Sequence, residues 1–206
     1  MTLATDLEFL QQMAQATPLR GWALAASGHG EEGIAQIRLA VYGVTRGSRD
    51  RPYHLAVLAD ACAQAGQTAE GLEVVGQALA TVGKSAVHWW EAELHRLKGE
   101  LLLQHSVAPP EEAEACFQQA LDIARRQQAK SLELRAAMSL SRLWQLQGKS
   151  GAARELLAPI YGWFTEGFDT ADLQEAKVLL EELRGDAKRE EKEAAGGRPG
   201  GGGEDG

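Results

Sequence analysis

The sequence predicts an all-α protein, a right-handed superhelical solenoid built from antiparallel helix pairs. Two observations lead to this fold class. A short turn with a small residue five positions later recurs about every forty residues. Apolar residues then follow each small residue at spacings of four and seven, which place them on one face of a helix. No segment requires a β-strand.

The recurring turns fix the order of the helix pairs. Three copies begin with a glycine and reach a small residue five positions later, at Gly28 to Gly33, Gly66 to Gly71 and Gly148 to Ala153. A fourth copy replaces the glycine turn with Ala108-Pro109-Pro110 and leads into Ala113. Antiparallel helices approach closely where a side chain is no larger than that of alanine, so these small residues are expected at helix crossings.

A second helix follows each small residue, and a first helix precedes each turn. The second helices are indicated by four pairs of residues at the two spacings: Ile37 and Ala40, Val75 and Ala78, Phe117 and Ala120, Leu157 and Ile160. The prolines Pro18, Pro52 and Pro110 stand where helices are expected to begin. Each unit is therefore a helix, a turn and a helix.

The C-terminal part of the chain predicts two further features. An apolar pattern from Asp169 to about Arg184 indicates one more amphipathic helix that caps the stack. Residues 185–206 contain many glycines and charges and almost no large apolar residue, which is typical of disorder. We therefore expect a domain of about four repeats plus the capping helix over residues 1–184, and a disordered tail over residues 185–206.

Composition excludes several classes of function. The net charge of -8 argues against general attraction to nucleic acid or anionic membranes. No apolar run is long enough to cross a membrane, and the first residues lack the pattern of a signal peptide, so we expect a cytoplasmic protein. The two cysteines, Cys62 and Cys116, lie in apolar helical patterns and predict neither a disulfide nor a zinc site.

Motifs that resemble chemical sites are better explained by the repeats. Residues 28–33 spell GxGxxG, but a helix rather than a strand is expected before them. The GKS triplets at 83–85 and 148–150 lack the earlier glycine of a phosphate loop. His88, Glu91 and His95 leave a zinc site unclosed. We predict no catalytic residue, no metal site and no cofactor, and hence a chain that is not itself an enzyme.

Four tryptophans lie on helical stripes, where a large ring either fills a core or anchors a partner. Their places in the repeat pattern favour the core. The four residues are Trp89, Trp90, Trp144 and Trp163.

Long stretches of the chain resemble a known class of helical-repeat region. They cover most of residues 18–184, at 19–38, 51–72, 89–103, 113–149 and 153–183. These stretches are similar to the C-terminal tetratricopeptide-like repeats of bacterial signalling proteins that also contain an adenylate/guanylate cyclase-type domain and an ATPase domain. The resemblance implies a stand-alone repeat protein or a fragment of such a protein, with cyclase or ATPase domains attached or associated. It carries no active site.

The first helices of such repeats line a concave groove for a peptide or helix. Eight residues are predicted to face it: Tyr53, Asp60, Glu93, Arg96, Glu100, Arg135, Arg142 and Gln145. With acidic residues in the middle units and arginines in the last, the row favours a partner with the opposite order of charges.

We therefore predict a non-catalytic scaffold or regulatory module whose partner is a protein or peptide, with no direct contact to nucleic acid or membrane. Two alternatives stay open. The chain could be a regulatory fragment of a multidomain cyclase/ATPase signalling protein, or the sensor part of a transcription regulator.

Overall fold

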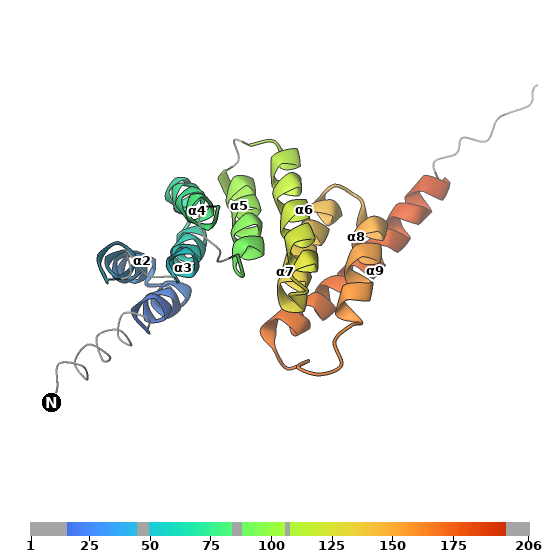
Figure 1. The fold of residues 1–206 in the computed structure, drawn as a ribbon. Helices are drawn as coiled ribbons and strands as arrows, with labels where there is room; N and C mark the ends of the chain where they lie inside the picture. The colour runs from blue at the N-terminus through green and yellow to red at the C-terminus, as the bar shows by residue number, and fades with distance from the viewer. Residues whose placement is uncertain (1–15, 45–49, 84–87, 106–107, 197–206) are drawn as a thin grey trace, which may run out of the picture. The chain divides into compact units, whose positions relative to one another are not determined.

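A computed structural model describes residues 16–44, 50–83, 88–105 and 108–196. Residues 1–15 of the expected repeat domain and 197–206 of the expected tail lie outside them. Within the described ranges all regular structure is helical (Figure 1). The chain divides into two compact units, unit 1 over Met1–Leu132 and unit 2 over Glu133–Gly206.

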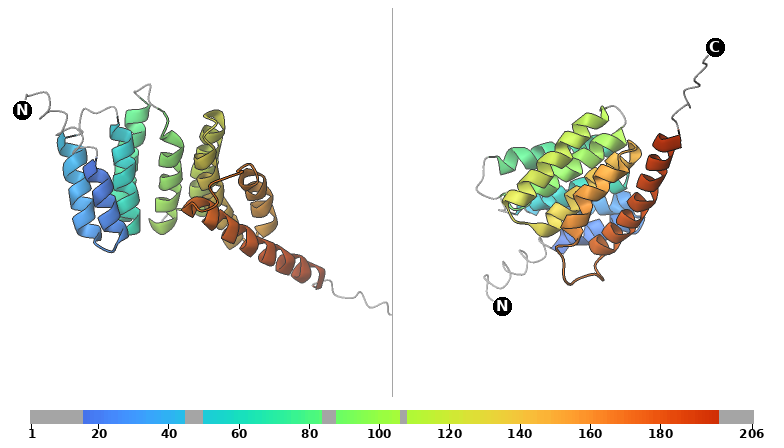
Figure 2. Two further views of the ribbon diagram at one scale, coloured as in Figure 1. Left: turned by 90° about the horizontal axis from the view of Figure 1, so that it is seen from below. Right: turned by 90° about the vertical axis from the view of Figure 1, so that its right-hand side faces the viewer.

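Unit 1 is a row of helices joined by short turns. Its described part starts with the helical residues 16–26. Helix α2 (Gly30–Leu39) follows, and the π-helical turn η1 (Ala40–Val44) extends it. The next helices are α3 (Arg51–Gln64), α4 (Thr68–Val82), α5 (Glu91–His105) and α6 (Pro110–Arg126). Neighbours in sequence pack against each other from α2 through α6, and α3 also contacts α5 (Figure 2).

The small residues mark the helix crossings in unit 1, as predicted. A Cβ atom at Gly33 would meet the backbone of Gly21 and Ala25, and one at Gly71 would meet the Leu101 side chain. Glycine is therefore required by space at Gly33, where a methyl group would meet backbone atoms, whereas at Gly71 the end of the Leu101 side chain would have to move. An additional crossing glycine is Gly99, where a Cβ atom would lie 2.5 Å from the ring of Phe117.

The turns between paired helices share one backbone geometry. Gly28, Gly66 and Gly148 have φ values of 93°, 72° and 69°, in the left-handed region that glycine adopts most easily. Gln128 takes the same role after α6 with a φ of 55°. In every one of these turns an amide donates to the carbonyl five residues earlier: His29 to Leu24, Gln67 to Cys62, Ala129 to Ala124 and Lys149 to Trp144.

An apolar core lies between the helices of unit 1 from residues 16–26 to α5. Leu55, Leu58 and Val75 are fully buried there, and Leu94 and Leu101 of α5 join them. Burial of apolar surface is the main stabilising term of such a fold.

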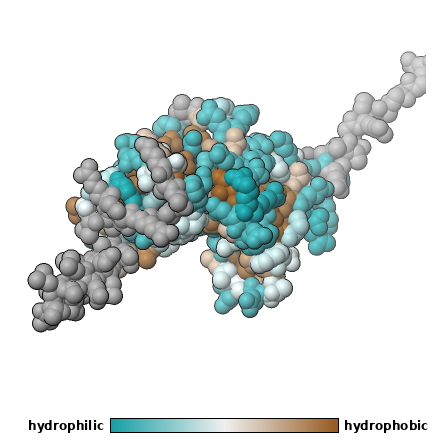
Figure 3. Space-filling view, in the orientation of Figure 1, coloured by the Kyte–Doolittle hydropathy of each residue, from teal (hydrophilic) through white to brown (hydrophobic). Residues whose placement is uncertain are grey.

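The surface is mixed, and Figure 3 shows hydrophilic residues over much of one face with apolar residues between them.

Unit 2 contains α8 (Ser150–Tyr161), α9 (Ala171–Gly196) and all but the first turn of α7 (Lys130–Leu146). The Ser141 hydroxyl donates to the carbonyl oxygen of Ala153 at 3.1 Å, which places these two small residues where α7 meets α8. Helix α9 packs on α8 and buries Leu173, Leu179 and Leu183. It includes the amphipathic helix that the sequence predicts from Asp169 to about Arg184.

The end of α9 corrects the expected boundary at residue 184. The helix continues to Gly196, so residues 185–196 are helical rather than part of a disordered tail. Their alanines, glutamates, lysines and arginine are good helix formers. Asp186 and Glu190 also accept hydrogen bonds from Gln145 and from the backbone amide of Ser150. Polar contacts therefore extend this helix beyond its apolar stripe.

Candidate functional site

The first helices of unit 1 present a polar and aromatic surface that we call the first-helix face. It is defined by Trp22, Tyr53, Asp60, Arg96 and Glu100. Asp60 lies at its centre, because the Trp22 indole bonds to the Asp60 carboxylate and the Asp60 charge acts on Arg96. Tyr53 lies two helical turns before Asp60 on the same side of α3. The face thus spans the helix of residues 16–26, α3 and α5.

Asp60 is a partly exposed carboxylate with neutral hydrogen-bond donors. The indole N–H of Trp22 and the amide of Gln64 both donate to its Oδ2 atom, the latter at 2.8 Å. These two bonds hold the carboxylate in place without cancelling its charge. Trp22 itself keeps 39% of its surface exposed, so part of its ring lies open next to the carboxylate.

Arg96 forms the buried part of the first-helix face. It donates to both Glu93 oxygens at 3.0 and 2.8 Å and to Glu100 at 2.7 Å. Burial alone would lower its pKa, but the charge and hydrogen bonds of Glu93, with Glu100 and Asp60, raise the pKa above its usual value. Three of the predicted groove residues therefore form one ion-pair network within α5. Glu93 and Arg96 are buried, so they stabilise α5 rather than contact solvent.

An aromatic cluster of Tyr53, Trp89 and Trp90 lies where α3 and α5 begin. The Tyr53 ring stacks on Trp89 with centroids 5.7 Å apart and meets Trp90 edge-on at 5.2 Å. Trp89 leaves 49% of its surface exposed, whereas Trp90 packs against the core. The expectation of core tryptophans holds for Trp90. It is wrong for Trp89 and for Trp163, which is 58% exposed in the α8–α9 connection.

The three predicted groove residues of unit 2 contact α9 instead of an open groove. Arg142 pairs with Glu175, and Arg135 lies 3.9 Å from Asp172. The Gln145 amide donates to Asp186 at 2.8 Å. Carboxylates of α9 therefore pair with Arg135 and Arg142, the two arginines that the sequence analysis expected to bind a partner. Reversing the charge of both arginines would disturb α9 directly, so these residues are poor reporters of ligand binding.

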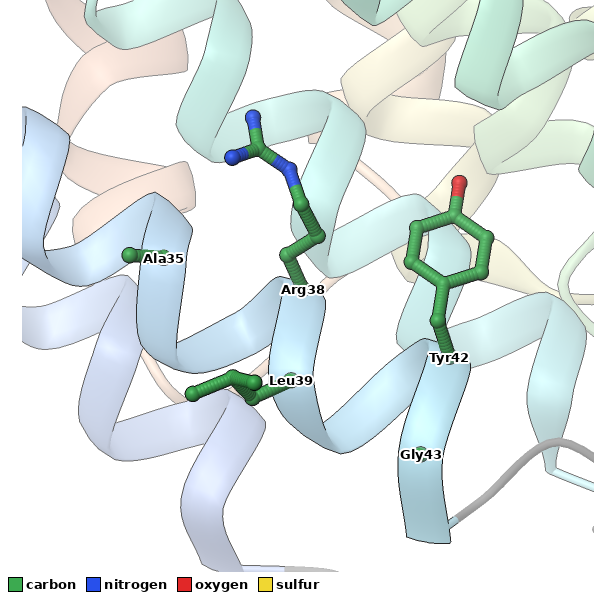
Figure 4. A pocket seen from close by; sticks show the side chains of 5 residues that line it. All are labelled: Ala35, Arg38, Leu39, Tyr42 and Gly43. Atoms are coloured by element: carbon green, nitrogen blue, oxygen red, sulfur yellow. The ribbon is translucent and has the colours of Figure 1, made fainter.

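A pocket on α2 and η1 was not predicted. Ala35, Arg38, Leu39, Tyr42 and Gly43 line a cavity of about 500 Å³, and Figure 4 shows the Arg38 and Tyr42 side chains extending from one side of the helix. Arg38 pairs with Glu70, and the Tyr42 hydroxyl donates to Gln77. Leu39 is 75% exposed. Its exposure breaks the amphipathic pattern, which is the signal that could have indicated this pocket.

The motifs with a chemical appearance have structural settings. Gly28 lies in the turn between two helices and Gly30 and Gly33 lie in α2, so a helix precedes the motif in place of the strand that a dinucleotide site requires. His88 pairs with Glu91 at 3.1 Å, and within the described ranges no three metal-ligating side chains converge. Burial raises the pKa of the Cys62 thiol to about 12, and it also raises the pKa of Cys116. Both thiols are therefore weak nucleophiles.

No protein-family model and no curated protein matches the sequence. Solved structures do match. A crystal structure of nearly identical TPR-like repeats, from a Podosopora anserina protein assigned to the kinesin light chains, aligns with 88% of this chain and 90% of its own at a TM-score of 0.64 and 16% identity. A crystal structure of a variant of the same repeats aligns with 86% of this chain and 96% of its own, at a TM-score of 0.60 and 17% identity.

The chain has the fold of a TPR-like repeat solenoid. The predicted fold class, an all-α stack of antiparallel helix pairs, is thus confirmed. No helix among the described residues combines the length and the apolar character needed to cross a membrane. At this level of identity the likeness concerns the fold alone.

Proposed function

We propose that this protein is a non-catalytic interaction module that holds a peptide or helix of another protein on the first-helix face of unit 1. The observation that carries the proposal is the exposed Trp89 ring, which stacks on Tyr53 on the same side of α3 as Asp60. Exposed tryptophan is costly to hydrate and is enriched among residues that anchor protein partners.

The surroundings of Trp89 support binding rather than simple exposure. Its ring contacts Tyr53 and Trp90, so it is held in a fixed position before a partner arrives. A preorganised anchor loses little conformational entropy on binding. The buried Arg96 network stiffens α5 beside it. The surface therefore combines an apolar anchor with polar groups whose positions are already set.

The experiment is a selection of random peptides against the full-length protein, followed by affinity measurements on variants. We expect Trp89→Ala to lower the affinity for the selected peptides by about tenfold or more, because the variant loses an anchor residue. Leu39→Ala serves as the control, because it removes an exposed apolar residue from the pocket on α2. Circular dichroism verifies that both variants are folded. Peptides that lose affinity with Leu39→Ala and keep it with Trp89→Ala would move the site to the pocket.

The association with cyclase or ATPase domains stays a prediction that rests on the resemblance of the sequence alone. We propose it as the setting in which the module acts, regulating an attached or associated enzyme. The test is co-purification of the full-length chain with a bacterial cyclase-type domain and an ATPase domain, each supplied separately. Absence of complex formation with both would contradict this setting and leave peptide binding untouched.

A further inference from the structure

The hydrogen bonds of Asp60 leave its negative charge available to a ligand. Both of its donors, the Trp22 indole and the Gln64 amide, are neutral. The nearby cation, Arg96, already bonds to Glu93 and Glu100. Arg96 also feels the charge of Asp60, so this one guanidinium is shared among three carboxylates. A partly buried carboxylate that is ordered but not charge-matched favours a cation from outside.

Trp22 adds a second, independent attraction for a cation. Its ring is 39% exposed and is fixed beside Asp60 by the indole hydrogen bond. Lysine and arginine are attracted to the face of an indole ring, and a guanidinium group also stacks on it. One basic side chain can therefore lie on the Trp22 ring while it donates hydrogen bonds to the Asp60 carboxylate.

The distance along α3 sets the spacing between this basic residue and the apolar residue that covers Trp89. Asp60 follows Tyr53, the stacking partner of Trp89, by seven residues in one helix. Seven residues of α-helix rise about 10 Å. An extended peptide covers about 3.3 Å per residue, so roughly three of its residues span this distance.

We propose that the first-helix face binds an extended basic peptide. An arginine or lysine of the peptide lies on Trp22 and Asp60, and an apolar residue about three positions away lies on Trp89 and Tyr53. This inference rests on the proposed function and specifies the chemistry of the partner. An acidic peptide is disfavoured, because its carboxylate would meet Asp60 with no cation supplied by the peptide.

Synthetic fluorescent peptides with one leucine and one arginine in a serine-glycine background test this inference by anisotropy with the full-length protein. The distance between leucine and arginine is varied, and glutamate replaces arginine in a matched series. The protein variants are Asp60→Asn and Trp22→Leu. Glu181→Gln, which removes an exposed carboxylate of α9, is the control for loss of charge.

The expected result is tightest binding at a spacing of about three residues, with affinity lowered about tenfold in the glutamate series and in Asp60→Asn. Glu181→Gln should bind like the wild-type protein. The basic partner is ruled out if the glutamate peptides bind as tightly as the arginine peptides. It is also ruled out if Asp60→Asn binds a Trp89-dependent peptide with the affinity of the wild-type protein. Both results leave the proposed function standing. A clear optimum at another spacing overturns the extended arrangement.

Failure of the two proposals can be told apart by peptides from the random selection. If the designed peptides do not bind but selected peptides bind and require Trp89, the basic-peptide inference is wrong and the interaction module stands. If no peptide of either kind depends on Trp89, both proposals fall.

Discussion

In each unit one pair of side chains links a first helix to the helix two places further along the chain, and the two pairs differ in charge. In unit 1 the neutral Trp22 indole bonds to Asp60, whereas in unit 2 Arg142 forms an ion pair with Glu175. Trp22, Asp60 and Arg142 each precede the small residue of their repeat by eleven positions. The same place in the repeat is thus charge-matched within the chain in unit 2 and not in unit 1.

This difference shows why a position in a repeat does not by itself define a binding residue. The repeat pattern determines which side of the first helix a residue occupies, but the helix two places further along the chain determines what it meets. For α7 of unit 2 that helix is α9, whose carboxylates pair with Arg135 and Arg142. A ligand is therefore expected on the surface of unit 1, where Asp60 shares a single cation, Arg96, with Glu93 and Glu100.

The largest expected effect comes from removing a buried charge in unit 1. Arg96→Ala leaves Glu93 buried without its cation, which costs about 3–5 kcal/mol in the free energy of unfolding. Arg142→Ala breaks a pair exposed to solvent in unit 2 and should cost about 1 kcal/mol or less. Urea unfolding measures both. Similar losses of unfolding free energy for the two variants would contradict the claim that the buried pair contributes more than the exposed one.

The helix crossings give the next largest difference. Gly33→Ala brings a methyl group onto the backbone of Gly21 and Ala25, and the strain should cost about 3 kcal/mol. The reverse change in unit 2, Ala153→Gly, creates no clash and should cost about 1 kcal/mol through helix propensity. Thermal unfolding of the two variants compares them directly, and a more stable Gly33→Ala protein would contradict the close approach.

Acid should weaken unit 1 selectively, because all five histidines lie there. Burial lowers the pKa of His54 and of His95 below the usual value of about 6.5. Below this pH the unfolded chain binds more protons than the folded chain. The free energy of unfolding is therefore highest above about pH 6.5 and decreases as the pH falls below that value. His54→Gln should make this fall shallower in urea unfolding between about pH 7.5 and pH 5.5. An identical slope would mean that His54 does not contribute.

The smallest effect concerns thiol chemistry in unit 1. Cys62 is fully buried and its pKa is raised to about 12, so it should not react with iodoacetamide in the folded protein at mildly alkaline pH. Unfolding in urea should expose it to rapid alkylation. Mass spectrometry of the modified peptides distinguishes it from Cys116. Fast modification of Cys62 without urea would indicate that α3 opens locally.

The repeat pattern was sufficient to predict the fold but not every boundary or turn. The recurrence of glycine five positions before a small residue indicates the turns at Gly28, Gly66 and Gly148, whereas the turn at Gln128 has no glycine and no such signal. The end of α9 was missed because residues 185–196 lack an apolar stripe. Their helix depends on propensity and on polar contacts such as that of Glu190 with the Ser150 amide.

The candidate site was predicted in part. Tyr53, Asp60 and Glu100 lie on the first-helix face, but the sequence could not show that Trp22 bonds to Asp60 across 38 residues. The same spacing to a small residue that located Asp60 also applies to Trp22, and this is the signal that could have found it. The exposure of Trp89 depends on the neighbouring rings and has no signature in the helical periodicity.

The most direct test of the central claim is radical footprinting of tryptophan side chains in the presence of a selected peptide. Trp22 and Trp89 of unit 1 and Trp163 of unit 2 are all exposed in the free protein, so each can report protection. Binding on the first-helix face predicts that Trp22 and Trp89 become protected while Trp163 stays as reactive as before. Protection of Trp163 alone would contradict the proposed site and move the interaction to unit 2.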